Sequence, residues 1–104
     1  MIKREKRRYL ALKVEYKRPL DERAILYAIQ ASVSRLFGEY GASQAKIKQV
    51  KYFPEKQQLV IRCSHNMLDK VKAAITSIIE INGENAAIHV FGVSGTLKAL
   101  SKKT

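Results

Sequence analysis

The sequence predicts an α+β fold in which two helices cover one face of a four-stranded antiparallel sheet. Three observations lead to this prediction: stretches of alternating apolar and polar residues, stretches with apolar residues at helical spacing, and turn residues between them. The stretches follow the order β-α-β-β-α-β within 104 residues. Because β-α-β crossovers are right-handed, this order closes into a ferredoxin-like sandwich, the arrangement of RNA-recognition motifs, with a short C-terminal helix added.

The first strand and the first helix are predicted over residues 9–16 and 21–37. Apolar and polar residues alternate through the first stretch, which indicates a half-buried strand that Pro19 ends. Asp21 is a suitable N-cap for the helix. The helix should bury one apolar stripe. That stripe consists of Ile25, Ile29, Val33 and Leu36.

The middle of the sequence predicts a hairpin formed by residues 46–53 and 59–63. Residues 54–57, Pro-Glu-Lys-Gln, are suited to the turn between them. In the second strand, simple alternation places Gln49 and Lys51 on one face, and Val50 and Tyr52 on the other. In the third strand, alternation gives one apolar face, formed by Leu59, Ile61 and Cys63.

The second helix should begin at Ser64 or Asn66 and run to about Ile81, where Asn82-Gly83 stops it. Its predicted stripe consists of Leu68, Val71, Ile75, Ile78 and Ile79. A fourth strand follows over residues 86–93, and residues 97–103 suit a short last helix. The residues that join both helices to the sheet in the core are expected to be Leu12, Ile29, Ile61 and Ile75.

The charge balance points to a polyanionic partner. Twenty Lys and Arg residues stand against nine Asp and Glu, which gives a net charge of +11 and an isoelectric point near 10.0. Such an excess favours nucleic acid, because neutralising phosphates releases condensed counterions. We expect one domain, residues 1–104, with a basic N-terminal arm over residues 1–7 and a basic tail over residues 98–104.

The two basic ends should form one patch. The first and fourth strands of a ferredoxin-like sheet are antiparallel neighbours, so the arm and the tail lie at the same end of this strand pair. We expect their cations to contact RNA phosphates, which are recognised without regard to base identity. The predicted contacts are Lys3, Arg4, Lys6, Arg7, Arg8, Lys98, Lys102 and Lys103.

Few residues could form a catalytic site or a metal site in this chain. His65 and His89 stand alone, Cys63 is the single cysteine, and the carboxylates are scattered, so we expect neither a metal site nor a catalytic acid–base pair. No apolar run approaches the length of a membrane-spanning helix, and a cytosolic protein is expected. Base stacking has little support, since Tyr9 alone offers a ring on the open face and Phe91 is expected in the core.

Three segments carry a resemblance to a known family. Residues 8–15 read Arg-Tyr-Leu-Ala-Leu-Lys-Val-Glu, residues 58–64 contain Ile-Arg-Cys, and residues 92–98 contain Ser-Gly-Thr ahead of the basic tail. In this order and spacing they resemble the archaeal ribonuclease P protein component 2 family, over nearly the whole chain. The resemblance adds Ser94 and Thr96 to the expected RNA contacts. It also makes Gly95 a position where a positive φ is expected.

The resemblance implies a protein subunit of ribonuclease P, the ribonucleoprotein that removes the 5′ leader of precursor tRNA. In that family the RNA subunit hydrolyses the phosphodiester with bound magnesium, and the protein supports the catalytic RNA. No cofactor and no catalytic residue are therefore expected in this chain. The implied partners are the ribonuclease P RNA, protein component 3 and other protein subunits, with precursor tRNA as the substrate of the complex and no membrane involved.

Other readings remain open on the sequence alone, because a fold does not fix a function. One is a different RNA-binding scaffold, such as a ribosome-associated protein of the same fold. Another is a small-molecule regulatory domain or an acylphosphatase-like enzyme, for which no phosphate-binding loop is found. We also expect a protein interface, with component 3 or in a self-dimer. It should involve apolar residues of the first helix that lie outside its core-facing stripe: Leu26, Tyr27 and Phe37.

Overall fold

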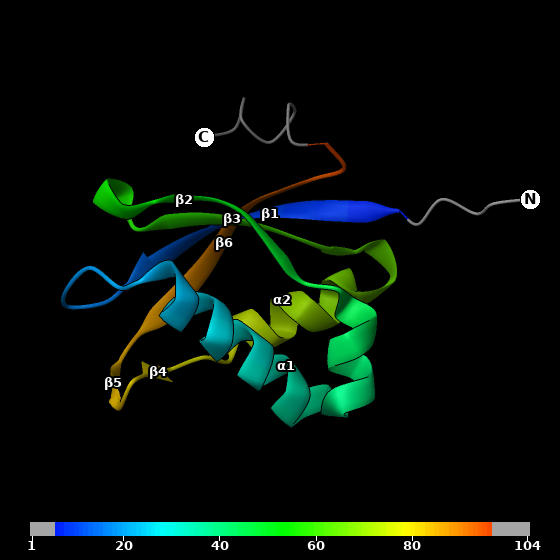
Figure 1. The fold of residues 1–104 in the computed structure, drawn as a ribbon, viewed down its shortest axis with the longest axis horizontal. Helices are drawn as coiled ribbons and strands as arrows, with labels where there is room; N and C mark the ends of the chain where they lie inside the picture. The colour runs from blue at the N-terminus through cyan, green and yellow to red at the C-terminus, as the bar shows by residue number, and fades with distance from the viewer. Residues whose placement is uncertain (1–5, 97–104) are drawn as a thin grey trace, which may run out of the picture.

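The computed structural model describes residues 6–96 and shows the predicted two-layer architecture (Figure 1). Its elements are β1 (Arg7–Glu15), α1 (Glu22–Ala45), β2 (Lys48–Phe53), η1 (Pro54–Lys56), β3 (Gln58–Ser64), η2 (His65–Met67), α2 (Leu68–Thr76), β4 (Glu80–Ile81), β5 (Glu84–Asn85) and β6 (Ala87–Ser94). The antiparallel main sheet has the order β2-β3-β1-β6, and α1 and α2 both cover one of its faces. The ferredoxin-like prediction is confirmed, while the predicted last helix lies outside the described residues.

Helix α1 begins as predicted but continues beyond Phe37. Asp21 caps it, since its Oδ1 accepts a hydrogen bond from the backbone N–H of Arg23 at 3.1 Å. Gly38 has a φ of 77° and kinks the helix, which then resumes to Ala45. The prediction for the end of the stripe is wrong: Phe37 packs against the core and Leu36 is exposed. Phe37 follows Val33 by four residues, which keeps it on the buried face.

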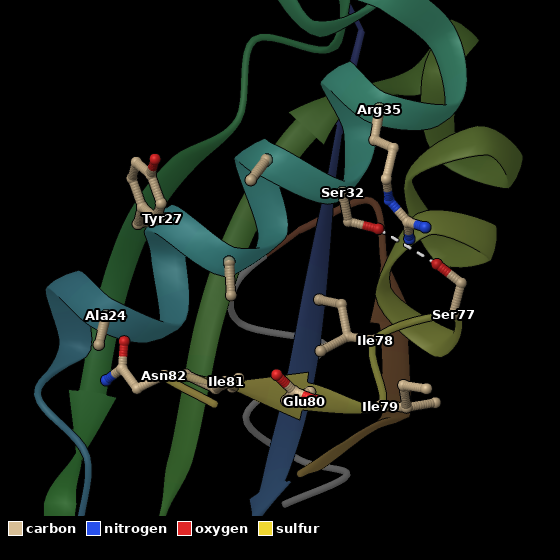
Figure 2. A pocket seen from close by; sticks show the side chains of 12 residues that line it. Ala24, Tyr27, Ser32, Arg35, Ser77, Ile78, Ile79, Glu80, Ile81 and Asn82 are labelled. Carbon is tan, nitrogen blue, oxygen red and sulfur yellow. Dashed lines mark hydrogen bonds between the residues drawn. The ribbon is translucent and has the colours of Figure 1, made fainter. Parts of the chain in front are cut away.

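Helix α2 is shorter than predicted at both ends. Ser64 does not cap it, and a 3₁₀ turn, η2, precedes it. The helix ends at Thr76, and residues up to Ile81 leave it to form a small hairpin, β4–β5. Asn82 and Gly83 both have positive φ, 53° and 79°, as a two-residue turn of type I′ requires. The segment after Thr76 runs beside α1. Figure 2 shows Ile78 and Ile79 of this segment pointing in different directions.

Two β-bulges interrupt the alternation of the edge strands. Val50 is the extra residue of β2, because Gln49 pairs with Ile61 and Lys51 with Val60. The predicted faces of β2 are therefore wrong beyond the bulge, and Tyr52 packs against the core. In β6 the extra residue is Phe91, which is 40% exposed and outside the core in which we had expected it.

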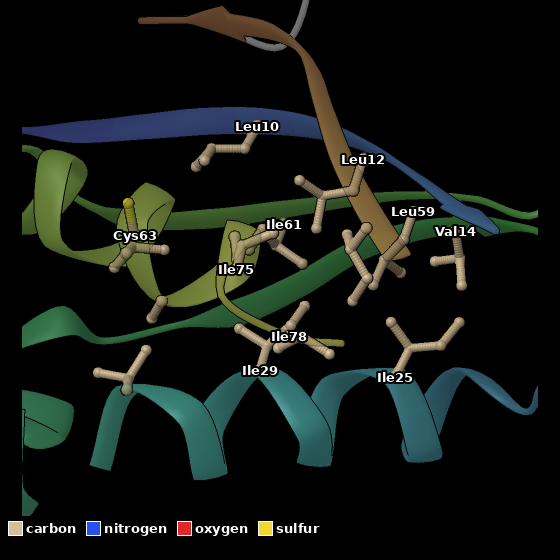
Figure 3. Packing of buried hydrophobic residues seen from close by; sticks show 14 of the residues in the cluster. Leu10, Leu12, Val14, Ile25, Ile29, Leu59, Ile61, Cys63, Ile75 and Ile78 are labelled. Carbon is tan, nitrogen blue, oxygen red and sulfur yellow. The ribbon is translucent and has the colours of Figure 1, made fainter. Parts of the chain in front are cut away.

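The core lies between the helices and the inner face of the sheet. The four residues expected to join these layers, Leu12, Ile29, Ile61 and Ile75, are all fully buried. Figure 3 shows leucines of β1 and β3 pointing towards isoleucines of α1 and the α2 region. Because these side chains pack against the helices, the opposite face of the sheet is the one left uncovered by them.

Candidate nucleic-acid interface

The face of the sheet opposite the helices, here called the open face, is organised in rows that cross the strands. One row consists of Lys48, Arg62, Tyr9 and Ser94. The next consists of Lys51, Val60, Ala11 and Gly92. A third consists of Phe53, Gln58, Lys13 and His89, and Arg7 pairs with Ser64 beyond the first row. Neighbours in a row are adjacent in space, because paired Cα atoms lie about 4.5–5.5 Å apart.

The centre of the open face is apolar. Ala11 and Val60 are buried there, and Tyr9, Val50 and Phe53 pack against them. The ammonium groups of Lys51 and Lys56 lie 5.1 and 5.9 Å from the centre of the Phe53 ring, which are cation–π distances. Rings that combine with cations in this way are suited to stacking with bases, which requires both a π-face and nearby positive charge.

The rim of the open face is positively charged. Arg7, Lys13, Lys48, Lys51 and Arg62 all project from it, and none forms an ion pair within residues 6–96. The one carboxylate that residues 6–96 place on it, that of Glu15, lies 3.4 Å from Nε2 of His89. The open face therefore presents five cations that no acid of residues 6–96 neutralises, placed around an apolar centre.

The residues predicted for RNA binding fall into two groups. One group lies outside the described residues: Lys3, Arg4, Lys98, Lys102 and Lys103. The other group lies at or next to the start of β1 or the end of β6: Lys6, Arg7, Arg8, Ser94 and Thr96. Arg8 and Gly95 touch, because a Cβ on Gly95 would lie 2.7 Å from a guanidinium nitrogen of Arg8. Gly95 does not have the positive φ that we expected. Tyr9 pairs with Ser94, so the start of β1 and the end of β6 do lie together as predicted. Ser94 Oγ accepts a hydrogen bond from the backbone N–H of Thr96 at 3.3 Å.

Sequence reasoning did not assign an RNA contact to Lys13, Lys48, Lys51 or Arg62. For Lys13 and Arg62 a signal was present, because both alternate with core residues in their strands. Lys48 and Lys51 are separated by an odd number of positions, and only the bulge at Val50 places both on one face.

The helical side of the molecule carries a groove of about 420 Å³ between α1 and the segment that follows α2 (Figure 2). Tyr27 and Ile79, 74% and 77% exposed, line it together with Arg35 and Glu80. At its base, Ser32 Oγ donates a hydrogen bond to the Ala74 carbonyl at 2.7 Å. Of the predicted interface residues, Tyr27 is therefore accessible. Leu26 and Phe37 pack against the core, so the structure gives them less surface than we expected.

The described titratable groups include one buried thiol. Burial raises the pKa of the Cys63 thiol to about 11, which keeps it protonated and unreactive. Among residues 6–96, no three His, Cys, Asp or Glu side chains gather where they could hold a metal ion. No described helix is long and apolar enough to cross a membrane.

A family model and curated relatives point to one family, and a solved structure shares the fold. The model of the Rpp14/Pop5 family matches residues 8–104. Ribonuclease P protein component 2 of Pyrococcus furiosus is 38% identical over 96% of this chain and 83% of its own length. The protein of the same name from Methanosarcina mazei is 33% identical over 96% of this chain and 84% of its own length. A chain in the cryo-EM structure of yeast ribonuclease MRP has the same fold, with a TM-score of 0.70 and 14% identity over 93% of this chain and 79% of that one.

Proposed function

The chain belongs to the Rpp14/Pop5 family and is a protein subunit of ribonuclease P, and from this premise we propose that it binds the RNA of that complex through the open face of its sheet. The observation that carries the proposal is the charge of this face: within residues 6–96 it holds five cations without an ion pair and one carboxylate beside a histidine. Cations spread over such a surface bind phosphates and release counterions. The apolar centre would contact riboses and bases.

The chain contributes to a ribonuclease complex without performing the chemistry itself. We propose that the RNA, with bound magnesium, hydrolyses the phosphodiester that joins the 5′ leader to precursor tRNA. The scattered carboxylates of residues 6–96 support this division of labour, since magnesium sites are built from oxygen ligands that converge. The purified chain should leave precursor tRNA intact, and adding the RNA with component 3 should allow cleavage. Magnesium-dependent cleavage by the chain alone, free of RNA, would overturn the proposal.

A protein partner fits the groove on the helical side. We propose that component 3 binds there, with a self-dimer as the alternative occupant and a cytoplasmic complex as the setting. Tyr27 and Ile79 support the assignment, because large apolar side chains at this exposure are typical of protein interfaces. Leu26 and Phe37 are not suited to testing the interface, since charged residues there would disturb the core.

The groove is tested with Tyr27→Ala and Ile79→Asp in one chain. Both side chains are exposed, so the variant should fold normally and yet sediment without component 3. The matched control is Tyr40→Ala, which removes a tyrosine of similar exposure from the same helix but outside the groove. Sedimentation of the double variant with component 3 at the wild-type ratio, together with unchanged self-association, would contradict the assignment.

The open face is tested by its effect on RNA affinity. Lys13→Gln with Lys51→Gln should weaken binding to the ribonuclease P RNA, and the slope of log affinity against log salt should fall by roughly 1.4–1.8. Lys70→Gln with Lys72→Gln removes the same charge from the exposed surface of α2, in the other layer, and should leave the slope nearly unchanged. Equal losses in both variants would mean that general charge, rather than the open face, attracts the RNA.

A further inference from the structure

A basic pocket of about 310 Å³ opens at one end of the open face, where β1 and β2 begin and β3 ends. Four cationic residues, Arg7, Lys46, Lys48 and Arg62, line it with Ser64. Among residues 6–96, no carboxylate lines it. Concave sites that gather cations without acids are suited to anions, because the cations reinforce one another inside a hollow.

The pairing across the strands shows that these cations are held close together. Lys48 lies directly opposite Arg62, and Arg7 lies opposite Ser64 on the same face. Like charges in directly opposed positions destabilise a sheet. Neither Lys48 nor Arg62 has an acidic partner within residues 6–96 that would relieve this repulsion. The fold therefore contains an unfavourable pair that a bound anion would convert into a favourable triad.

Ser64 supplies a hydroxyl in the same pocket. The residue is 5% exposed, yet its side chain neither caps the following 3₁₀ turn nor hydrogen-bonds to another described residue. No described buried side-chain oxygen is left both unpaired and sealed from solvent, so this hydroxyl reaches the pocket. A hydroxyl donor beside an arginine is a common phosphate-binding pair, because guanidinium groups bind phosphate oxygens in bidentate fashion.

We propose that this pocket binds one phosphate of an unpaired RNA nucleotide and that the adjoining base stacks on Tyr9, an inference that rests on the proposed RNA-binding function. Tyr9 is the neighbour of Arg62 in the same row, one strand spacing of roughly 4.8 Å away. A phosphate at Arg62 thus brings its nucleotide to the Tyr9 ring. Bases of an intact duplex are stacked inside it and cannot reach a ring, so the pocket selects single-stranded RNA.

The first test uses a five-residue uridine oligonucleotide and the full chain, with fluorescence anisotropy over a range of salt. Lys48→Gln with Arg62→Gln should lower the slope of log affinity against log salt by about 0.7 or more. Arg23→Gln with Lys72→Gln is the matched control, since it removes one arginine and one lysine from exposed positions on the helices. Arg62→Lys keeps the charge and should still weaken binding, because an ammonium cannot replace the bidentate guanidinium.

The second test separates stacking from charge. Tyr9→Leu keeps an apolar contact with Ala11 and Val60, so the domain should remain folded. It should reduce affinity for the oligonucleotide roughly fivefold to a hundredfold while leaving the salt slope unchanged. Tyr9→Phe, which retains the ring, should restore most of the affinity. Wild-type affinity in Tyr9→Leu would overturn the stacking assignment.

The outcomes distinguish this inference from the proposed function. If Lys13→Gln with Lys51→Gln weakens binding of the ribonuclease P RNA but the pocket pair behaves like its control, the pocket assignment is wrong and the RNA surface stands. If the wild-type chain binds neither that RNA nor the oligonucleotide, the proposed function is wrong. Inorganic phosphate should perturb the amide resonances of Arg62 and Ser64 selectively. Equal perturbation around all basic residues would mean diffuse attraction and would overturn the pocket.

Discussion

Ile78 and Ile79 are neighbours in the chain that should respond very differently to truncation. Ile78 is 7% exposed and belongs to the core, whereas Ile79 is 77% exposed at the edge of the groove. If α2 continued to Ile81, both would follow Ile75 on its apolar stripe, at three and four residues. Replacing each isoleucine with alanine therefore tests whether the helix ends at Thr76.

The expected loss for Ile78→Ala follows from its burial. The change removes three methylene equivalents, worth roughly 0.8 kcal/mol each, and leaves a cavity that costs about 24 cal/mol per Å³ where the core does not collapse. The free energy of unfolding should thus fall by about 2–5 kcal/mol. In a domain of this size, each kcal/mol lowers the melting temperature by about 4–8 °C. Ile79→Ala should stay within about 0.5 kcal/mol of the wild type.

Urea denaturation followed by circular dichroism measures both losses, with the wild type as reference. The two variants should differ greatly in the free energy of unfolding, whatever the absolute stability of the wild type. Comparable losses would show that Ile79 is packed as well as Ile78, and hence that α2 extends through the segment assigned to the β4–β5 hairpin. Comparable small losses would show that the groove wall is loosely packed throughout.

Three further results are expected. Burial raises the pKa of Cys63 to about 11, so a maleimide at pH 8 should label the folded chain far more slowly than the unfolded chain, and equal rates would refute the burial. Hydrogen bonds from Lys17 and Tyr16, with Arg18 nearby, lower the pKa of Glu84. The ionised carboxylate therefore stabilises the fold above the unfolded-state pKa of the group, and this stabilisation is lost as the pH falls through the lowered value. Acid should thus remove the stability difference between Glu84→Gln and the wild type, and a difference that persists in acid would contradict the prediction. The last variant replaces four basic residues of the arm and the tail with alanine: Lys6, Arg7, Lys102 and Lys103. The slope of log RNA affinity against log salt should fall by roughly 3–4, and an unchanged slope would mean that these residues are solvated and do not contact RNA.

Most of the fold could be predicted because the apolar pattern is regular in the central strands. Inward-facing and outward-facing residues alternate without interruption along β1 and β3, and the inward-facing Leu12 and Ile61 are fully buried. The failures occur where one local conformation breaks a period. Gly38 kinks α1 without ending it, and the positive φ at Asn82 and Gly83 makes a hairpin where a helix stop was predicted. An Asn-Gly pair is a strong hairpin signal, so this second failure was avoidable.

The candidate site was harder to predict than the fold. The excess of cations was visible in the composition, but their arrangement depends on the register of four strands. Consecutive basic residues stand near the two ends of the chain, and the sequence therefore predicted the RNA contacts there. Arg62 stands singly among apolar neighbours in β3, and only pairing with Lys48 and Tyr9 gives it a place in a row. Composition reports the charge, while register decides where the charge is concentrated.

The distribution of carboxylates explains how one small domain can offer different surfaces to two kinds of partner. Glu15 is the one acid on the open face of the described strands, and the other described acids lie in the helices, at the N-cap of α1, in η1 or in the β4–β5 hairpin. Phosphates would therefore meet little repulsion on the open face, whereas the groove, lined by both Arg35 and Glu80, is less selective for charge. Because the core fixes α1 and the sheet as two packed layers, the proposed RNA and protein surfaces keep a constant relative orientation. In this way the domain would hold the proposed RNA and protein partners in a fixed relative position, and such placement lowers the entropic cost of a reaction.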